Sequence, residues 1–220
     1  ADEINASGGA AGHLIKPFLI DQYKTLEEAR QAVYPLSQDM DVAFALGFYK
    51  SEIAQSLIQL MQYYGLPVII NADVNEILDN QWTSGVFRAT INTRHIAKAL
   101  YRQCVANKTQ SVILCYSSEL YPQSIASTMI GLLRDNPDME AQIYRVDALT
   151  NEWRFKLKAA TEHPEFRDKK TAGVILLNDL DKIEILLSTL VKDGDIDMAF
   201  TTDMAIDRGK QISNRLNTPI

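Results

Sequence analysis

The chain opens with the stretch EINASGGAAGHLIKPFLID, residues 3–21, in which two adjacent glycines separate a polar segment from an apolar one. Loops that bind phosphate place their glycines after a strand and before a helix, so that free amides at the helix start face the anion. Here the order is reversed. Residues 1–6 are expected to end a helix, Gly8 or Gly9 supplies the left-handed residue that closes it, and residues 15–21 are expected to form a strand. The stretch therefore predicts a helix that stops and leads into a strand, with no phosphate site.

The rest of the chain continues this alternation of helices and strands. Short apolar runs alternate with amphipathic segments of ten or more residues, a pattern typical of strand–helix units around a parallel sheet. The expected helices are residues 25–38, 51–65, 93–108, 122–136, 152–166 and 180–194, and the expected strands are residues 41–47, 66–72, 84–92, 111–118, 140–147, 172–179 and 196–202. We therefore predict an α/β protein with two doubly wound, Rossmann-like parallel-sheet lobes and a ligand cleft between them.

The alternation falls into two series, which sets the expected domain organisation. Residues 1–91 are predicted to form an N-terminal lobe and residues 92–220 a C-terminal lobe, with a hinge near residues 89–93. The sequence opens within a helix, and residues 204–220 predict a helix, an asparagine turn and a proline-led strand start. Strands are therefore expected to be missing at both ends.

Composition narrows the class of protein. The 220 residues are 46% hydrophobic, which is enough for a sizeable core. The formal net charge is −6, and no basic cluster with interleaved aromatic residues occurs, so nucleic acid is disfavoured as a partner. No apolar run reaches the length of a membrane span, and no charged-then-apolar leader indicates a compartment.

The residue types that carry most chemistry are sparse. Cys104 and Cys115 form no Cys-x-x-Cys motif; two buried thiols are favoured over a disulfide between a helix and the following strand. His13, His95 and His163 lack the spacing of metal ligands, so neither a metal nor a cofactor is expected. No Ser/His/Asp arrangement or Gly-x-Gly-x-x-Gly motif is visible, so we predict no catalytic residues and no enzyme.

Several stretches resemble one protein family. Residues 1–12, ADEINASGGAAG, are similar to a helix end in the leucine-isoleucine-valine-binding proteins, which have the type I periplasmic-binding fold. Residues 45–51 (ALGFYKS), 66–78 (LPVIINADVNEIL) and 85–92 (GVFRATIN) resemble later landmarks of the first lobe in that family. The resemblance implies a periplasmic or otherwise extracytoplasmic receptor that closes two lobes around an amino acid or related carboxylate. It also implies a partner, either a membrane permease of an ABC transporter or a signalling module.

In the first lobe, the resemblance implies three ligand-binding positions. A Gly-x-x-x-Ser turn puts Gly47 and Ser51 where the family binds the ligand carboxylate; the alternative is that Ser51 only caps its helix. The backbone amide of Ala72 is expected to meet the same carboxylate. Val74 stands where the family has threonine. This departure removes a hydroxyl donor, so the carboxylate is held less well or the ligand is not an α-amino acid.

In the second lobe, the resemblance implies two more positions. Tyr121 matches an aromatic residue that covers the ligand, and its alternative role is packing at a helix start. Asp203 matches the acid that receives the ligand's α-ammonium group, and its alternative role is to cap the following helix. Phe48, Tyr49 and Tyr116 are further candidates for the cleft lining.

Other functions remain open at this point. Residues 201–212, TTDMAIDRGKQI, are also similar to an Asp-x-Met-Ala segment of LacI-type regulators, which sense sugars, although the sequence contains no DNA-binding headpiece. A ligand-free module that binds another protein would leave Ser51 and Asp203 as exposed helix caps with no shared cleft. Open sheet edges favour pairing between chains, so a homodimer is a further alternative.

Overall fold

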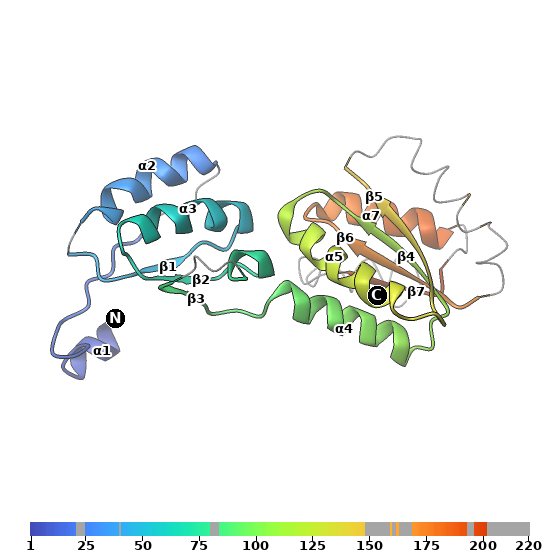
Figure 1. Ribbon diagram of the computed structural model, residues 1–220, viewed down its shortest axis with the longest axis horizontal. Coiled ribbons are helices and arrows are strands. Elements are labelled where there is room, and N and C mark those ends of the chain that lie inside the picture. The colour runs from blue at the N-terminus through green and yellow to red at the C-terminus, as the bar shows by residue number, and fades with distance from the viewer. Residues whose placement is uncertain are drawn as a thin grey trace.

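The computed structural model describes residues 1–20, 25–39, 41–79, 84–147, 159, 162, 169–192 and 196–201. These residues form two parallel sheets, one with the strand order β1-β2-β3 and one with the order β5-β4-β6-β7. Figure 1 shows the two sheets at opposite ends of the long axis, each with its own helices. The predicted α/β class with parallel sheets is confirmed. We call the first sheet with its helices the first unit, and the second sheet with its helices the second unit.

The first unit has helices over one face of its sheet (Figure 1). Its strands are β1 (Ala45–Gly47), β2 (Val68–Ile70) and β3 (Val86–Arg88), and its covering helices are α2 (Leu26–Ser37) and α3 (Ser51–Tyr63). Thr25 begins α2 with a capping box, in which its hydroxyl accepts from the Glu28 amide at 3.2 Å. Leu57 of α3 and Ile70 of β2 are fully buried between the layers.

The opposite face of this sheet carries a row of apolar side chains. Leu46, Ile69 and Phe87 are register partners across the three strands. Leu46 is 69% exposed and Phe87 60% exposed, because no described helix covers them. The predicted strand over residues 41–47 is therefore confirmed only over Ala45–Gly47, where Ala45 and Gly47 are partly buried and Leu46 is exposed.

The N-terminal segment matches the prediction only as far as the glycines. Helix α1 (Asp2–Ala6) ends as expected, with Gly8 at φ +100°, a left-handed value that favours glycine. The predicted strand is wrong over residues 15–20, which form no strand. No described strand pairs with them, and the backbone groups of Ile15 bond instead to the Asn5 side chain, at 2.7 Å to Oδ1 and 2.8 Å from Nδ2.

The second unit has helices on both faces of its sheet. The strands are β4 (Ser111–Tyr116), β5 (Glu140–Arg145), β6 (Thr171–Leu176) and β7 (Met198–Thr201), and the helices are α4 (Thr93–Ala106), α5 (Leu120–Arg134) and α7 (Leu180–Lys192). The central strands β4 and β6 are buried almost throughout. Helices α4 and α5 pack on one face and α7 on the other. Helix α5 starts at Leu120, two residues before the predicted start at Pro122.

The two cysteines lie on opposite faces of the second sheet. Cys104 packs with α4 and α5, whereas Cys115 packs against α7. Both thiols are free and buried, which confirms the preferred prediction over the disulfide. Burial raises the pKa of Cys104 from 9.0 to about 11 and that of Cys115 from 9.0 to about 12.

The buried thiols predict a loss of stability in alkaline solution. A raised thiol pKa means that the folded chain keeps protons that the unfolded chain releases. The free energy of unfolding should therefore fall as the pH rises above about 9, the ordinary thiol pKa, and keep falling through the folded value of about 12 for Cys115. Urea unfolding at pH 8 and pH 10 measures this, with Cys115→Ala expected to lose part of the pH dependence. An unchanged dependence in that variant would contradict the assignment to Cys115.

Candidate ligand-binding site

The candidate site starts from two neighbouring loops at the carboxyl ends of β1 and β2. The Asn71 amide donates to the Gly47 carbonyl oxygen at 2.9 Å, so the loop that leads into α3 lies beside the loop that follows β2. Open parallel sheets bind ligands at this edge. Both first-unit stretches that resembled ligand-binding turns therefore lie where the topology allows a site.

Ser51 is the first residue of α3, and it is only 4% exposed. The residue that caps the helix is Lys50, whose side chain makes no capping hydrogen bond, so the alternative of Ser51 as the cap is wrong. No residue in the described part of the chain bonds to the Ser51 hydroxyl. The first amides of a helix have no partner within the helix and carry its positive end. The start of α3 therefore offers a hydroxyl and free N–H groups to an anion.

The backbone before α3 is held in an unusual conformation. Gly47 has φ +141°, and Phe48 has φ +63°, in the left-handed region that non-glycine residues rarely occupy. Such conformations persist only where the surrounding structure holds them, and they cluster at binding and catalytic sites. The side chain of Phe48 packs against the core of the first unit, which anchors this turn.

The loop after β2 is held by an arginine. Arg88, at the end of β3, donates from Nε to the Ala72 carbonyl oxygen at 3.0 Å and from its guanidinium to the Val74 carbonyl oxygen. Burial lowers the pKa of Arg88, while the nearby Asp73 acts in the opposite direction. The amide of Ala72 has no acceptor among the described residues, although the residue is fully buried. It is thus a free donor near the start of α3.

Val74 stands at a position that resembles a ligand-binding threonine, but its side chain packs in the core. Its side chain is fully buried in the core of the first unit. A valine there can pack but cannot donate a hydrogen bond. The contact that the family makes through a threonine hydroxyl is therefore absent from this position of the chain.

Tyr121 lies where the two units meet. It stands in the first turn of α5, and its half-buried side chain packs against the hydrophobic cores of both units. The preceding amide, that of Leu120, donates to Glu52 Oε1 of α3 at 3.0 Å, so the first turns of α3 and α5 meet. The structure thus brings Ser51, Ala72 and Tyr121 to one region. Asp203 lies outside the described residues.

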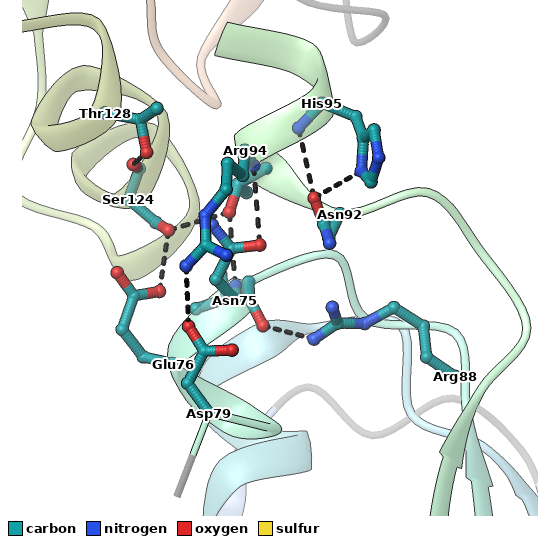
Figure 2. A network of polar contacts seen from close by, with 11 residues as sticks. Asn75, Glu76, Asp79, Arg88, Asn92, Arg94, His95, Ser124 and Thr128 are labelled. Carbon is teal, nitrogen blue, oxygen red and sulfur yellow. Dashed lines mark hydrogen bonds and ion pairs between the residues drawn. The ribbon is translucent and has the colours of Figure 1, made fainter. Parts of the chain in front are cut away.

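A network of polar side chains joins the units beside this region, and no motif in the sequence indicates it (Figure 2). The Thr93 hydroxyl of α4 lies 2.8 Å from the Ser124 hydroxyl of α5, which donates to Glu76 Oε2 at 2.7 Å. The Asn75 amide donates to Thr93 Oγ1 at 3.2 Å. Asn75 and Glu76 belong to the short helix η1 (Asn75–Ile77), which follows β2. The network therefore connects the first unit to helices α4 and α5 of the second unit.

An exposed ion pair extends the same junction. Arg94 Nη2 lies 2.9 Å from Asp79 Oδ2, and Figure 2 shows the pair next to Asn75. Asn92 begins α4 by accepting from the His95 amide at 3.0 Å. His95 is therefore the residue whose amide is bound by the cap of α4.

Within the described ranges, no group of three or more His, Cys, Asp or Glu side chains is placed to hold a metal ion. None of the described helices is both long and apolar enough to cross a membrane.

Comparisons with known proteins find similar structures but no similar sequences. No protein-family model matches the sequence, and no curated protein matches it. Solved structures do match. The substrate-binding protein LivJ from Streptococcus pneumoniae, solved with isoleucine, has a TM-score of 0.68 at 17% identity, over 98% of this chain and 59% of that one. A substrate-binding protein from Desulfitobacterium hafniense has a TM-score of 0.65 at 15% identity, over 100% of this chain and 57% of that one.

A third match carries a different ligand. A solute-binding protein from Rhodopseudomonas palustris HaA2, solved with p-hydroxybenzoic acid, has a TM-score of 0.66 at 12% identity, over 83% of this chain and 49% of that one. The chain has the fold of ABC-transporter substrate-binding proteins. The type I periplasmic-binding fold implied by the sequence resemblance is thereby confirmed. The chain spans about half to three-fifths of the length of these three structures.

Proposed function

We propose that this chain binds a small carboxylate between its two units, as part of a solute-binding protein that serves an ABC transporter. The start of α3 carries the proposal. There, the hydroxyl of Ser51, a residue that is only 4% exposed, and the helix amides have no described partner, and the free amide of Ala72 lies on the adjacent loop. Donors that converge at a helix start suit an anion. Binding, rather than catalysis, is the role that this arrangement supports.

The proposal includes the movement of two lobes. The chain passes from β3 of the first unit to α4 of the second through residues 89–92, within the predicted hinge at residues 89–93. We propose that residues 1–91 and 92–220 close around the ligand at this hinge. A ligand that touches both lobes stabilises the closed state only by its higher affinity for that state. An extracytoplasmic location and a permease partner belong to the same proposal and rest on the shared fold.

The ligand class follows from the donors that the site has and from those that it lacks. Val74 supplies no hydroxyl, so fewer donors hold the carboxylate than the family pattern implies. An α-amino acid needs an acceptor for its ammonium group, and Asp203 is the proposed one. An aromatic carboxylate needs no such acceptor, and Tyr121 would cover either ligand. The matched structures hold isoleucine in one case and p-hydroxybenzoic acid in another, so both ligand classes are candidates.

A thermal-shift screen tests the function. The probes are leucine, isoleucine, p-hydroxybenzoate, other amino acids and small carboxylates, and a set of sugars. A ligand at 100 times its dissociation constant adds about 2.7 kcal/mol, which corresponds to a rise in Tm of roughly 5–11 °C for a chain of this length. A response to sugars alone would favour a sensor of the LacI type. No response to any probe would count against a small-molecule site in this chain.

Ser51→Ala should weaken binding of the ligand found in this screen by about tenfold, because one hydrogen bond to a charged group is lost. Isothermal titration measures the change in Kd. The matched control is Ser56→Ala on the same helix, since the Ser56 hydroxyl donates only to the Glu52 carbonyl at 3.1 Å. Asp203→Asn separates the ligand classes: it should weaken an amino acid and leave an aromatic carboxylate unchanged. Equal effects of Ser51→Ala and Ser56→Ala would contradict a direct role for Ser51.

A further inference from the structure

One carboxylate of the first unit caps a helix of the second. Glu52 stands in the first turn of α3, and its Oε1 accepts from the Leu120 amide at 3.0 Å. Leu120 is the first residue of α5. The residue before it, Glu119, occupies the capping position but makes no side-chain capping hydrogen bond. Glu52 therefore does for α5 what a capping side chain normally does from within the same chain segment.

The electrostatics of this contact are favourable in only one arrangement of the units. The first amides of a helix lack partners within the helix, and the helix dipole makes that end positive, so a carboxylate there is stabilising. The donor and the acceptor are 68 residues apart and lie in different units. If the units separate at the hinge, the Leu120 amide loses this acceptor. The contact thus contributes free energy to the described arrangement and none to one in which α3 and α5 are apart.

A second carboxylate of the first unit contacts the same helix on the side of the connecting segment. Glu76 accepts from the Ser124 hydroxyl, which also contacts Thr93, the first residue of α4. This contact includes Thr93, next to the proposed hinge, whereas the Glu52 contact lies outside the network that joins Glu76, Ser124 and Thr93. The Glu52 contact is therefore the better candidate for a contact that opening at the hinge would break.

We propose that Glu52 is a latch, which holds α5 against α3 and so stabilises the closed arrangement in the absence of ligand. The latch also fixes the first turn of α5, where Tyr121 packs against both units. Glu52 thus sets the balance between open and closed states without contacting the ligand. This inference rests on the two-lobe closure proposed above, but not on any ligand.

The test uses the ligand-free chain and removes the two ends of the latch separately. Glu52→Ala removes the acceptor. Leu120→Pro removes the donor, because proline lacks an N–H and is favoured at the first position of a helix. Leu120→Ala is the matched control, since it shortens the side chain but keeps the amide. Spin labels are attached at Tyr63→Cys of α3 and Arg134→Cys of α5. Double electron–electron resonance then measures the distance between the two labels, one on each unit. Tyr63 is 82% exposed and the native thiols are buried, so labelling is selective.

Glu52→Ala and Leu120→Pro should each lower the closed-to-open ratio by roughly threefold to tenfold, the loss expected for one charge-assisted bond at a partly exposed site. The double variant should show no more than Leu120→Pro alone, because both changes remove the same bond and only the proline change also removes the packing of the Leu120 side chain on the first unit. Leu120→Ala should shift the ratio less. Unchanged distances in Glu52→Ala, or fully additive effects in the double variant, would overturn the latch. Circular dichroism confirms that each variant is folded, and Glu52→Met, which keeps a side chain of similar length but has no oxygen acceptor, serves if Glu52→Ala does not fold. A failed ligand screen would leave this result intact, so the two proposals fail separately.

Discussion

Leu57→Ala should lower the free energy of unfolding of the first unit by about 2–5 kcal/mol, the usual range for truncation of a buried leucine. Leu57 is fully buried in α3, among side chains of α2, β2 and the loop after β2. A cavity there removes contacts from both layers. Since α3 also carries Ser51 at its start, the site should lose order together with the helix. Urea unfolding measures the loss of free energy for the chain, and hydrogen exchange at low urea concentrations measures the loss of protection at each amide.

The same experiment tests the division into domains. If residues 1–91 and 92–220 are separate folding units, exchange should accelerate in α3 and β2 while β4 and β6 keep their protection. Gln59→Ala is the control, because Gln59 lies in the same helix with its side chain exposed. Equal loss of protection in both sheets would contradict the predicted boundary near residue 91. The polar network at Thr93 and Ser124 would then couple the units strongly enough to unfold them together.

Helix positions could be predicted from the sequence because their signals are local. Thr25 and Glu28 form a capping box within four residues, and Asn92 caps α4 by accepting from the amide three residues later. The buried positions of α3 recur at helical spacing from Ile53 to Met61. Each of these features depends only on neighbours along the chain, so no knowledge of the tertiary structure was needed.

Strands were less predictable because they depend on partners. Residues 15–20 have a strand-like composition, yet no described strand pairs with them. Leu46 has apolar neighbours along the chain, but it is exposed because only one face of the first sheet is covered. Composition gives the tendency of a segment to pair, whereas the sheet itself decides which edges and faces are filled.

The candidate site divides in the same way. The order of strand, turn and helix places Ser51 at the carboxyl end of a strand, but the resemblance to the leucine-isoleucine-valine-binding proteins is what marks it as a ligand-binding position. The contact from Glu52 to Leu120 crosses between units, so no spacing in the sequence indicates it. The role of Arg88 was missed for the same reason. Only the folded backbone brings its guanidinium to the carbonyl groups of Ala72 and Val74.

Arg88→Met should lower the stability of the first unit by roughly 1.5–3 kcal/mol and should also weaken ligand binding. The change keeps an apolar stem of similar length but removes the donors to both carbonyl groups. Those groups belong to buried residues, so losing their partner leaves acceptors unsatisfied. The loop after β2 would then relax and move the free Ala72 amide away from the start of α3. Chemical denaturation and isothermal titration with the ligand from the screen measure the two effects.

Arg88→Lys distinguishes the shape of the guanidinium from its charge. Lysine keeps a positive charge near Asp73, but its single ammonium cannot reproduce the fixed fork of the arginine. If the fork matters, Arg88→Lys should resemble Arg88→Met in affinity, with faster hydrogen exchange in residues 72–74. If charge alone matters, Arg88→Lys should bind the ligand as tightly as the unchanged chain. The assignment of Arg88 as the group that positions the Ala72 amide would then be wrong. Because Arg88 reaches only carbonyl groups of its own unit, its loss should leave the distance between spin labels on α3 and α5 unchanged. Loss of the Glu52 latch should change that distance, so the two contacts can be told apart in one set of variants.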